Sequence, residues 1–256
     1  MRLHLFEFGD QPWLPRPLRD AMTLYLRTVY QTTQLPALWA AKIGEVLRQT
    51  GDTRIVDLGS GAAGPIPLVA AELAKMGSPV RITLTDLQPN AGATPSSPNI
   101  TYWPEPVDAR AVPPALPGLR TMFAFFHHMR PPDARRILSG AAADRCAICV
   151  FEATSRSAPA IASSLVIPLL VLLLTPRIRP LSLFQLAFTY LIPILPLLIF
   201  WDGLVSHLRS YTGEEVAAMA ASLETPGYCW QTGVIPMRGL PEGLVYVAGY
   251  PVRQGD

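Results

Sequence analysis

The sequence predicts an α/β fold: a doubly wound sheet with a C-terminal antiparallel hairpin, plus an inserted apolar helical hairpin. Two observations favour the sheet. A strand, a glycine-rich turn and a helix follow one another over 54–76, and strand-like apolar runs then recur as far as 152. Near the end of the chain, a capped helix at 212–223 precedes two strands, at 227–235 and 244–250. Strands that alternate with helices are typical of a parallel sheet, whereas two successive strands are typical of a hairpin.

The individual elements follow from residue spacing. Apolar residues recur at helical intervals before residue 30, and a second helix is expected at 36–49, between a proline and a glycine. Short runs rich in β-branched or apolar residues predict five strands, at 55–58, 80–85, 99–103, 120–126 and 145–151. Helices are expected at 65–76 and 131–143. The segment 91–98 is rich in Gly, Pro and Ser, so a loop is expected there.

Composition restricts the classes of function. The 256 residues suit one α/β domain with an insertion, and only 16% are charged, against roughly a quarter in an ordinary globular chain. The net charge of +2 comes without a basic stripe, so we expect no nucleic-acid partner. Cys146 and Cys149 would point to opposite faces of one strand, which argues against a metal or redox pair. The N-terminus shows no signal-peptide pattern, so a reducing, cytoplasmic location is expected.

The glycine-rich turn is the most informative stretch. The strand at 55–58 breaks into Gly59, Gly61 and Gly64, and Pro65 then opens a helix. Glycine fits where the backbone needs a positive φ or where a ligand must touch the main chain. Free N–H groups and the positive end of a helix dipole would face a bound group there. Two ligand classes use such a turn, dinucleotides and S-adenosylmethionine (SAM).

Asp57, two residues before the first glycine, favours SAM over a dinucleotide, because SAM carries an ammonium group that the carboxylate can contact. The pattern Asp-x-Gly-x-Gly-x-x-Gly resembles motif I of class I, Rossmann-like SAM-dependent methyltransferases. The resemblance covers roughly 54–152 and 205–251. Within this family, the sequence is similar to a bacterial group that has a hydrophobic insertion after strand five. It implies SAM as cofactor. An NAD(P)-dependent oxidoreductase using the same turn is the alternative.

The resemblance also implies roles for other residues. Asp86, at the end of the second strand, would hold the ribose hydroxyls, and an acid with a small residue at 108–109 would lie by the adenine. The full set of expected cofactor contacts is Asp57, Gly59, Gly61, Gly64, Asp86, Leu87, Asp108, Ala109 and Phe126.

His127 and His128 follow the central strand, and the carboxyl ends of parallel strands form the ligand crevice. A neutral imidazole there can take a proton during methyl transfer to oxygen, while histidines hydrogen-bonded to a neighbouring loop are an equally good interpretation. Glu152, Asp202 and His207 are further catalytic candidates. No third metal ligand is evident at usual spacing, so no metal is expected. Asn-Pro-Pro-Tyr, which marks methylation of nucleic-acid bases in related enzymes, is absent from strand four, so that acceptor is disfavoured.

The sheet pattern does not explain the residues between 155 and 204. Two nearly uncharged runs, at 160–174 and 181–201, flank Arg177 and Arg179. They fit two membrane-spanning helices, a buried core hairpin, or a lid that dips into one leaflet while its arginines reach lipid phosphates. Spanning helices would put the arginines on the far side of the membrane, against the positive-inside tendency, and so much extra core is unusual for one domain. We therefore favour the lid.

The predicted organisation is an N-terminal helical cap at 1–50, with 6–13 covering the site, a SAM-binding domain at 51–154 and 205–256, and the insertion at 155–204. We expect methyl transfer to a small hydrophobic or lipid-like acceptor, by a protein that is peripheral or monotopic at the inner face of the cell membrane. A non-catalytic SAM-binding, membrane-associated protein is the remaining alternative. The sequence does not identify the acceptor or the oligomeric state.

Overall fold

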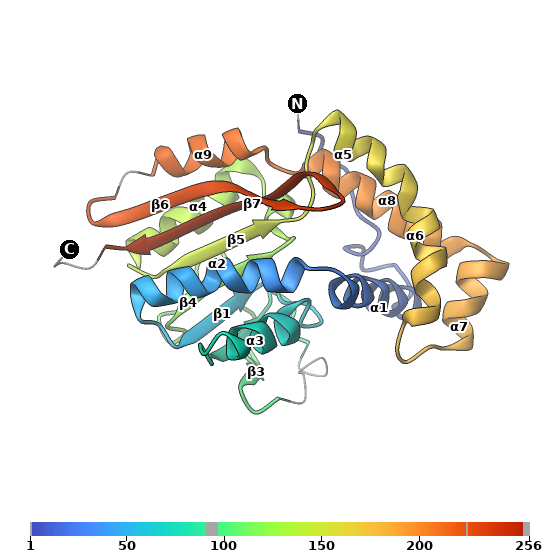
Figure 1. Cartoon of the computed structure of the whole chain (residues 1–256), viewed down its shortest axis with the longest axis horizontal. Coiled ribbons are helices and arrows are strands. Elements are labelled where there is room, and N and C mark those ends of the chain that lie inside the picture. Colours follow the sequence, from blue (N-terminus) through green and yellow to red (C-terminus); the bar gives the residue numbers. More distant parts are fainter. Residues whose placement is uncertain (1, 91–96, 224, 253–256) are drawn as a thin grey trace.

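The computed structural model describes residues 2–90, 97–223 and 225–252, and within them it contains one seven-stranded sheet (Figure 1). The strand order is β3-β2-β1-β4-β5-β7-β6. The strands are β1 (Arg54–Leu58), β2 (Arg81–Thr85), β3 (Ile100–Tyr102), β4 (Leu119–Phe123), β5 (Ile148–Glu152), β6 (Tyr228–Met237) and β7 (Leu240–Pro251). The predicted loop at 91–98 lies mostly outside the described residues.

Strand direction divides the sheet into two parts. The strands β1 to β5 pair in parallel, with β1 at the centre between β2 and β4. Strand β7 runs antiparallel to β5, and β6 pairs with β7 as a hairpin. The predicted doubly wound sheet with a terminal antiparallel hairpin is therefore confirmed. The order reverses at β1 and β4, so their carboxyl ends flank the crevice in which open sheets of this kind bind ligands.

Helices cover both faces of the sheet. On one face, α2 (Leu35–Thr50) and α3 (Ile66–Lys75) pack on apolar strand residues around the fully buried Trp39. On the other face lie α4 (Pro131–Ala143) and α9 (Gly213–Ala221). The expected capping box opens α9: the Thr212 hydroxyl accepts from Glu215 N, and the Glu215 carboxylate accepts from Thr212 N. Because helices cover both faces, β1, β4 and β5 are buried almost throughout, which is typical of central parallel strands.

One boundary differs from the prediction in a way that shapes the site. We predicted a strand over 120–126, but β4 ends at Phe123. Ala124 has a φ of 47°, a left-handed conformation that no regular strand contains. The chain then forms the short 3₁₀-helix η2 (Phe126–His128). An apolar run carries no signal for such a turn, and the turn is what places the two histidines above the strand end.

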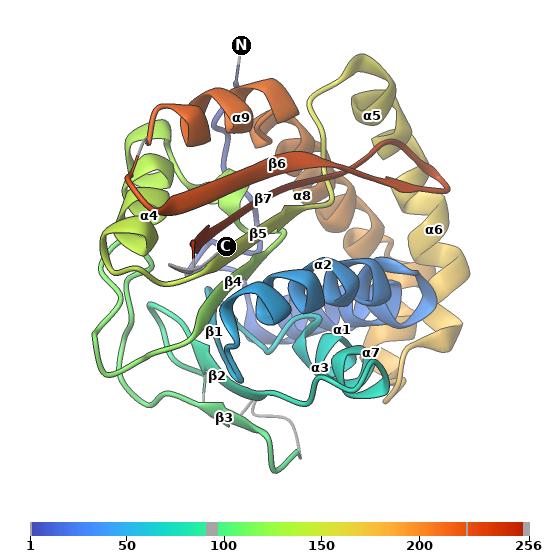
Figure 2. The same cartoon turned by 60° about the vertical axis from the view of Figure 1, so that its left-hand side comes forward.

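The insertion forms a separate helical layer beyond one end of the sheet (Figures 1 and 2). Its first arm joins α5 (Ala158–Ser163), η3 (Ser164–Val166), α6 (Ile167–Leu174) and η4 (Thr175–Arg177). Its second arm comprises α7 (Leu183–Leu186), the π-helix η5 (Ala187–Leu191) and α8 (Ile194–Arg209), with a bend of 79° before α8. Pro193, which has no N–H to donate, lies in the break and immediately precedes α8. The predicted hairpin is therefore present, but its second arm is broken and runs on to Arg209.

A third apolar cluster joins the insertion to the N-terminal helix α1 (Arg16–Thr32). Val171, Leu195 and Ile199 of the insertion pack with Met22 and Tyr25 of α1. Only one side of the first arm is covered in this way. Residues 158–177 are long and apolar enough to cross a membrane, yet only 22% of their most apolar window is buried. The outward side is a leucine stripe, in which Leu165, Leu169 and Leu173 are each more than half exposed.

Candidate active site

The glycine turn after β1 leaves open space above the strand. Gly59, Gly61 and Gly64 all have positive φ values, 72°, 49° and 42°. A Cβ at Gly61 or Gly64 would meet nothing within 4 Å, so glycine is required there by conformation and not by crowding inside the protein. Helix α3 begins directly after the turn, at Ile66. The turn is thus an open, glycine-lined surface beside a helix N-terminus.

Asp57 lies beneath this turn and is only 4% exposed. One carboxylate oxygen accepts from the Ser60 hydroxyl at 2.6 Å and the other from the Thr121 hydroxyl at 2.8 Å. Burial raises the pKa of Asp57 to about 7, although these two hydrogen bonds work in the opposite direction. The carboxylate therefore joins the turn to β4, and a nearby cation would lower its pKa again.

Asp86, at the end of β2, lies directly beside the turn. One of its carboxylate oxygens accepts from Gly61 N at 2.8 Å, and the other accepts from Gln88 N at 2.8 Å. On the other side, the Tyr102 hydroxyl donates to Gly61 O at 3.1 Å. Leu87, the next expected contact, is exposed. The carboxyl ends of β1, β2 and β3 therefore meet at Gly61, where an acid and a phenol flank the open surface.

The expected adenine-side residues and Phe126 contact other parts of the protein. The carboxylate of Asp108 is held by the Arg110 guanidinium, which also contacts Asp133, and Ala109 packs against the apolar cluster under α4 and α9. Phe126 is 1% exposed and packs in the core under α4, with its ring 5.4 Å from that of Tyr211.

The aromatic residue at the turn is Phe125, which sequence analysis did not select. Its ring lies so close to Gly59 that a Cβ there would be 2.5 Å away. It also stacks on His128, with ring centroids 5.0 Å apart. The sequence does not distinguish Phe125 from Phe126, because the left-handed backbone conformation of Ala124 decides which ring faces the turn.

His127 is buried and held by two acids. Its Nδ1 lies 2.8 Å from a carboxylate oxygen of Glu152, whose other oxygen accepts from His127 N at 2.9 Å. Its Nε2 lies 3.6 Å from Glu7 and has no hydrogen-bond partner in the described structure. Burial lowers the pKa of His127, but the charge of Glu152, its hydrogen bond to the ring and the charge of Glu7 outweigh burial and raise the pKa to about 9. Without another cation the imidazole is therefore protonated at neutral pH.

The second histidine has an analogous environment closer to solvent. His128 Nδ1 lies 3.1 Å from Asp10, and its Nε2 lies 3.5 Å from Glu7. Arg209, at the end of α8, lies 3.1 Å from Glu7 and 3.5 Å from Asp10. The sequence places Arg209 near the mouth of the crevice, as the structure shows, but it did not single out Glu7 and Asp10, because they lie far in sequence from the strand ends that frame the site. Glu7 and Asp10 do fall within the irregular 6–13 segment predicted to cover it.

The segment that carries Glu7 and Asp10 is tied down along its length. The carboxylate of Asp202 accepts from Phe8 N at 2.6 Å and from Gly9 N at 2.9 Å, and the Trp201 indole donates to Phe6 O. Arg2 donates to the carbonyls of His127, Met129 and Arg209.

The remaining catalytic candidates have supporting positions. Asp202 anchors the N-terminal segment through those backbone contacts. His207 is buried, with Nδ1 2.8 Å from the carbonyl of Ser155, and so joins α8 to the start of the insertion. Of the five candidates, the structure brings together His127, His128 and Glu152.

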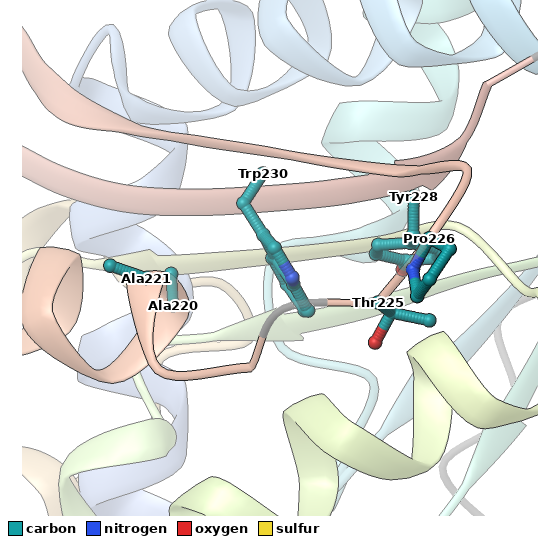
Figure 3. Close-up of a pocket in the computed structure, with 6 residues that line it drawn as sticks. All are labelled: Ala220, Ala221, Thr225, Pro226, Tyr228 and Trp230. Atoms are coloured by element: carbon teal, nitrogen blue, oxygen red, sulfur yellow. The ribbon is translucent and has the colours of Figure 1, made fainter.

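A surface hollow elsewhere on the protein has a different lining. It lies between α9 and β6 and is formed by Ala220, Ala221, Thr225, Pro226, Tyr228 and Trp230 (Figure 3). Tyr228 pairs with Pro251, while Gly249 pairs with Ile148 at the start of β5. The hollow is therefore at the amino end of the parallel strands, away from the glycine turn and the histidines.

The sheet order, the antiparallel β7 and the glycine turn after β1 define the fold of class I SAM-dependent methyltransferases, which confirms the resemblance in fold. No protein-family model matches the chain, and no curated protein matches it in sequence. The fold does match solved structures. A plantazolicin methyltransferase, BpumL, in complex with SAH is similar with a TM-score of 0.59 and 11% identity, covering 96% of this chain and 93% of that chain.

Two further structures support the same fold. BpumL in complex with a monoazolic desmethylPZN analog and SAH gives a TM-score of 0.54 at 9% identity, over 93% of this chain and 98% of that one. TnmH gives 0.51 at 16% identity, over 92% of this chain and 59% of that one. At these identities the likeness establishes the fold, and the activity has to be argued from the site.

Proposed function

We propose that the protein is a SAM-dependent methyltransferase that transfers a methyl group to oxygen on a small hydrophobic or lipid-like acceptor. The observation that carries this proposal is the open glycine turn, with Asp86 bonded to its backbone and the histidine pair beside it. Phe125 links the two parts, because it contacts both Gly59 and His128. A cofactor on the turn and an acceptor at the histidines would therefore be neighbours.

The residues present fit SAM. Gly61 and Gly64 offer a surface that any side chain would fill, and Asp86 is placed to accept ribose hydroxyls beside it. Asp57, with its pKa raised to about 7, is a buried acid whose ionised form an ammonium group would stabilise. A dinucleotide carries no such cation near the first turn, so Asp57 supports SAM over NAD.

The reaction requires the protein to position the two reactants and to remove one proton. When bound, SAM supplies an activated methyl group, so catalysis needs in-line positioning and an acceptor for the hydroxyl proton. We place the acceptor oxygen at His127 and His128. Their Nδ1 atoms are held by Glu152 and Asp10, which leaves the two Nε2 atoms to meet a third group. Buried partners fix the ring of His127, and Glu7 and Arg209 close the site above the pair.

The hydrophobic acceptor is supported by what surrounds the site. Phe6, Phe8, Trp13 and Trp201 form one aromatic cluster, with ring centroids 5.2–6.2 Å apart. Phe6 and Trp13 are about half exposed or more. The cluster joins the segment that carries Glu7 to Trp201 of α8, so apolar side chains adjoin the histidine pair.

The insertion supports a position at a membrane surface. Eleven large apolar residues in 155–204 are exposed: Leu165, Val166, Leu169, Leu170, Leu173, Leu181, Leu183, Tyr190, Leu191, Ile192 and Leu197. So many exposed apolar side chains within one insertion favour a surface that meets an apolar partner. Arg177 and Arg179 lie beside it, exposed and without a carboxylate partner among the described residues. We propose that this surface enters the inner leaflet while the arginines meet lipid phosphates.

The activity is tested by incubating the protein with methyl-labelled SAM and separate lipid and aqueous extracts. Label in a lipid-soluble product that disappears with Asp86→Ala supports the proposal. Label only in polar products would remove the hydrophobic acceptor. SAM binding without transfer in any extract would favour a non-catalytic SAM-binding protein.

The membrane surface is tested by flotation with liposomes. A variant with Leu165→Gln, Leu169→Gln and Leu173→Gln should stop floating while binding SAM as before, because these side chains make no core contacts. A control with Met76→Gln and Val234→Gln changes exposed apolar residues outside the insertion. A native protein that never floats, and that stays monodisperse without detergent, would contradict this part of the proposal.

A further inference from the structure

The side chains of Glu7, His127 and His128 converge closely beside the position proposed for the acceptor. One ligand-type atom from each residue lies within 4.8 Å of the other two. The three come from the N-terminal segment and from η2. Arg2 ties that segment to η2 through the His127 carbonyl, and Asp202 ties it to α8. Glu7 thus supplies the third ligand that sequence spacing did not reveal.

When both rings are neutral, the hydrogen-bond directions turn the lone pairs of these three residues toward one another. Because Nδ1 of His127 adjoins Glu152, it carries the proton, and the neutral ring then offers a lone pair at Nε2. His128 has the same arrangement with Asp10. The carboxylate of Glu7 also offers only lone pairs. One Glu7 oxygen accepts from the Ser206 hydroxyl at 3.0 Å and lies 3.1 Å from Arg209. The remaining lone pairs converge in a buried place, where a proton on an imidazole or a metal ion would stabilise them.

The spacing suits a metal ion better than direct hydrogen bonds. Glu7 lies 3.6 Å from His127 Nε2 and 3.5 Å from His128 Nε2, and the buried Nε2 of His127 has no hydrogen-bond partner in the described structure. Ordinary hydrogen bonds are about 2.7–3.2 Å long. Ligands at about 2.1 Å from a tetrahedral zinc ion lie roughly 3.4 Å from one another.

The surroundings resemble those of known metal ligands in their chemistry. A metal-bound histidine ordinarily donates its other ring N–H to a carboxylate, which fixes the tautomer and the ring orientation. Glu152 and Asp10 are placed for this on the two rings. In a metal-bound form with both rings neutral, the carboxylates of Glu7 and Asp10 face the guanidinium of Arg209, Glu152 holds His127, and Arg2 lies at the His127 carbonyl. A divalent cation would offset the negative charge that remains.

We propose that Glu7, His127 and His128 bind a divalent transition-metal ion, with imidazole and carboxylate ligands of the kind that favour zinc and its neighbours over magnesium. Three protein ligands leave positions open for an oxygen ligand. This deepens the proposed function, on which it rests for the identity of that oxygen: the acceptor hydroxyl. Its proton would go to Asp10, the cluster carboxylate that is most exposed to solvent.

Direct binding tests the site without any assay of activity. After treatment with a chelator, the protein is titrated with Zn²⁺ by calorimetry and with Co²⁺ by its visible absorption, in a background carrying Cys146→Ser and Cys229→Ser. We expect one site, binding Zn²⁺ at least about 100-fold more tightly than Mg²⁺. Glu7→Gln and His128→Ala should abolish it, and Asp10→Asn should weaken it about 10-fold or more. His4→Ala, at an exposed histidine outside the cluster, is the matched control.

Each outcome separates this inference from the proposed function. No binding by the parent protein, equal binding by Glu7→Gln and His128→Ala, or a preference for Mg²⁺ would overturn the metal site. If Glu7→Gln no longer shows a cooperative melting transition, Glu7→Asp takes its place. Glu7→Asp keeps the charge but shortens the side chain, so it should weaken metal binding while the fold is retained. SAM binding by the chelated protein is measured in parallel, so loss of one property is distinguished from loss of the other.

Discussion

The two halves of the candidate site are built in different ways. The glycine turn and its partners span residues 57–64, with Asp86 one strand away, and most of its contacts are to backbone. The histidine cluster instead joins residues 7–10, 127–128, 152 and 209, and its contacts are between charged side chains. The first half resembles a rigid surface that local conformation dictates. The second exists only once the N-terminal segment and α8 have packed onto η2, so it should be more sensitive to substitution.

The largest expected effect distinguishes the two histidines. His127→Ala leaves Glu152, which is 2% exposed, without its side-chain partner, and should cost about 3–5 kcal/mol in the free energy of unfolding. His128→Ala frees Asp10, whose side chain is 44% exposed, and should cost less than about 1 kcal/mol. Denaturant titration measures both. A double variant, His127→Ala with Glu152→Ala, should be more stable than the sum of the single losses implies, and strict additivity would contradict the assigned pair.

The pH dependence of stability tests the burial of Asp57. The pKa of this acid rises from 3.8 to about 7 on folding, so between these values the folded state binds more protons than the unfolded chain. Its contribution to stability is therefore present at low pH and lost as the pH rises through about 7, by roughly 4 kcal/mol at most. Asp57→Asn should gain in melting temperature relative to the parent between pH 5 and pH 8. The exposed Asp20→Asn is the control, and parallel curves for the parent protein and Asp57→Asn would show that Asp57 is not perturbed.

The backbone conformation of the turn sets the next effect. Gly61→Val places a β-branched residue at a φ of 49° and fills the open surface, so SAM affinity should fall about 100-fold while the fold survives. Gly140→Ala, in α4 with nothing near its Cβ, serves as control and should leave affinity unchanged. Undiminished binding by Gly61→Val would mean that the cofactor does not lie on this turn.

The smallest effect concerns the tether of the N-terminal segment. Asp202→Ala removes the acceptor for Phe8 N and Gly9 N, and it should cost about 1–3 kcal/mol because these backbone donors lose a partner. Amide hydrogen exchange at these two positions should accelerate while exchange in β1 is unchanged. Equal protection in the parent and the variant would show that the aromatic contacts alone hold the segment.

The same contrast explains what the sequence revealed. Strands, the glycine turn, the capping box and the terminal hairpin depend on short-range patterns, and these were predicted nearly in full. In the histidine cluster, His127, His128 and Glu152 were predicted because they follow strand ends. Glu7 and Asp10 were not singled out, because they reach the cluster through packing of a distant segment. The choice of Phe126 over Phe125 depended on the conformation of Ala124, which an apolar strand pattern does not encode.

The most direct test of the central claim is calorimetric titration of the purified protein with SAM and, separately, with NAD. Our account predicts that SAM binds at one site per chain, that Asp86→Ala weakens this binding at least about 10-fold through loss of the ribose contact and of the bond to Gly61 N, and that NAD does not bind. Binding of NAD without binding of SAM would contradict the account and would favour an oxidoreductase that uses the same turn.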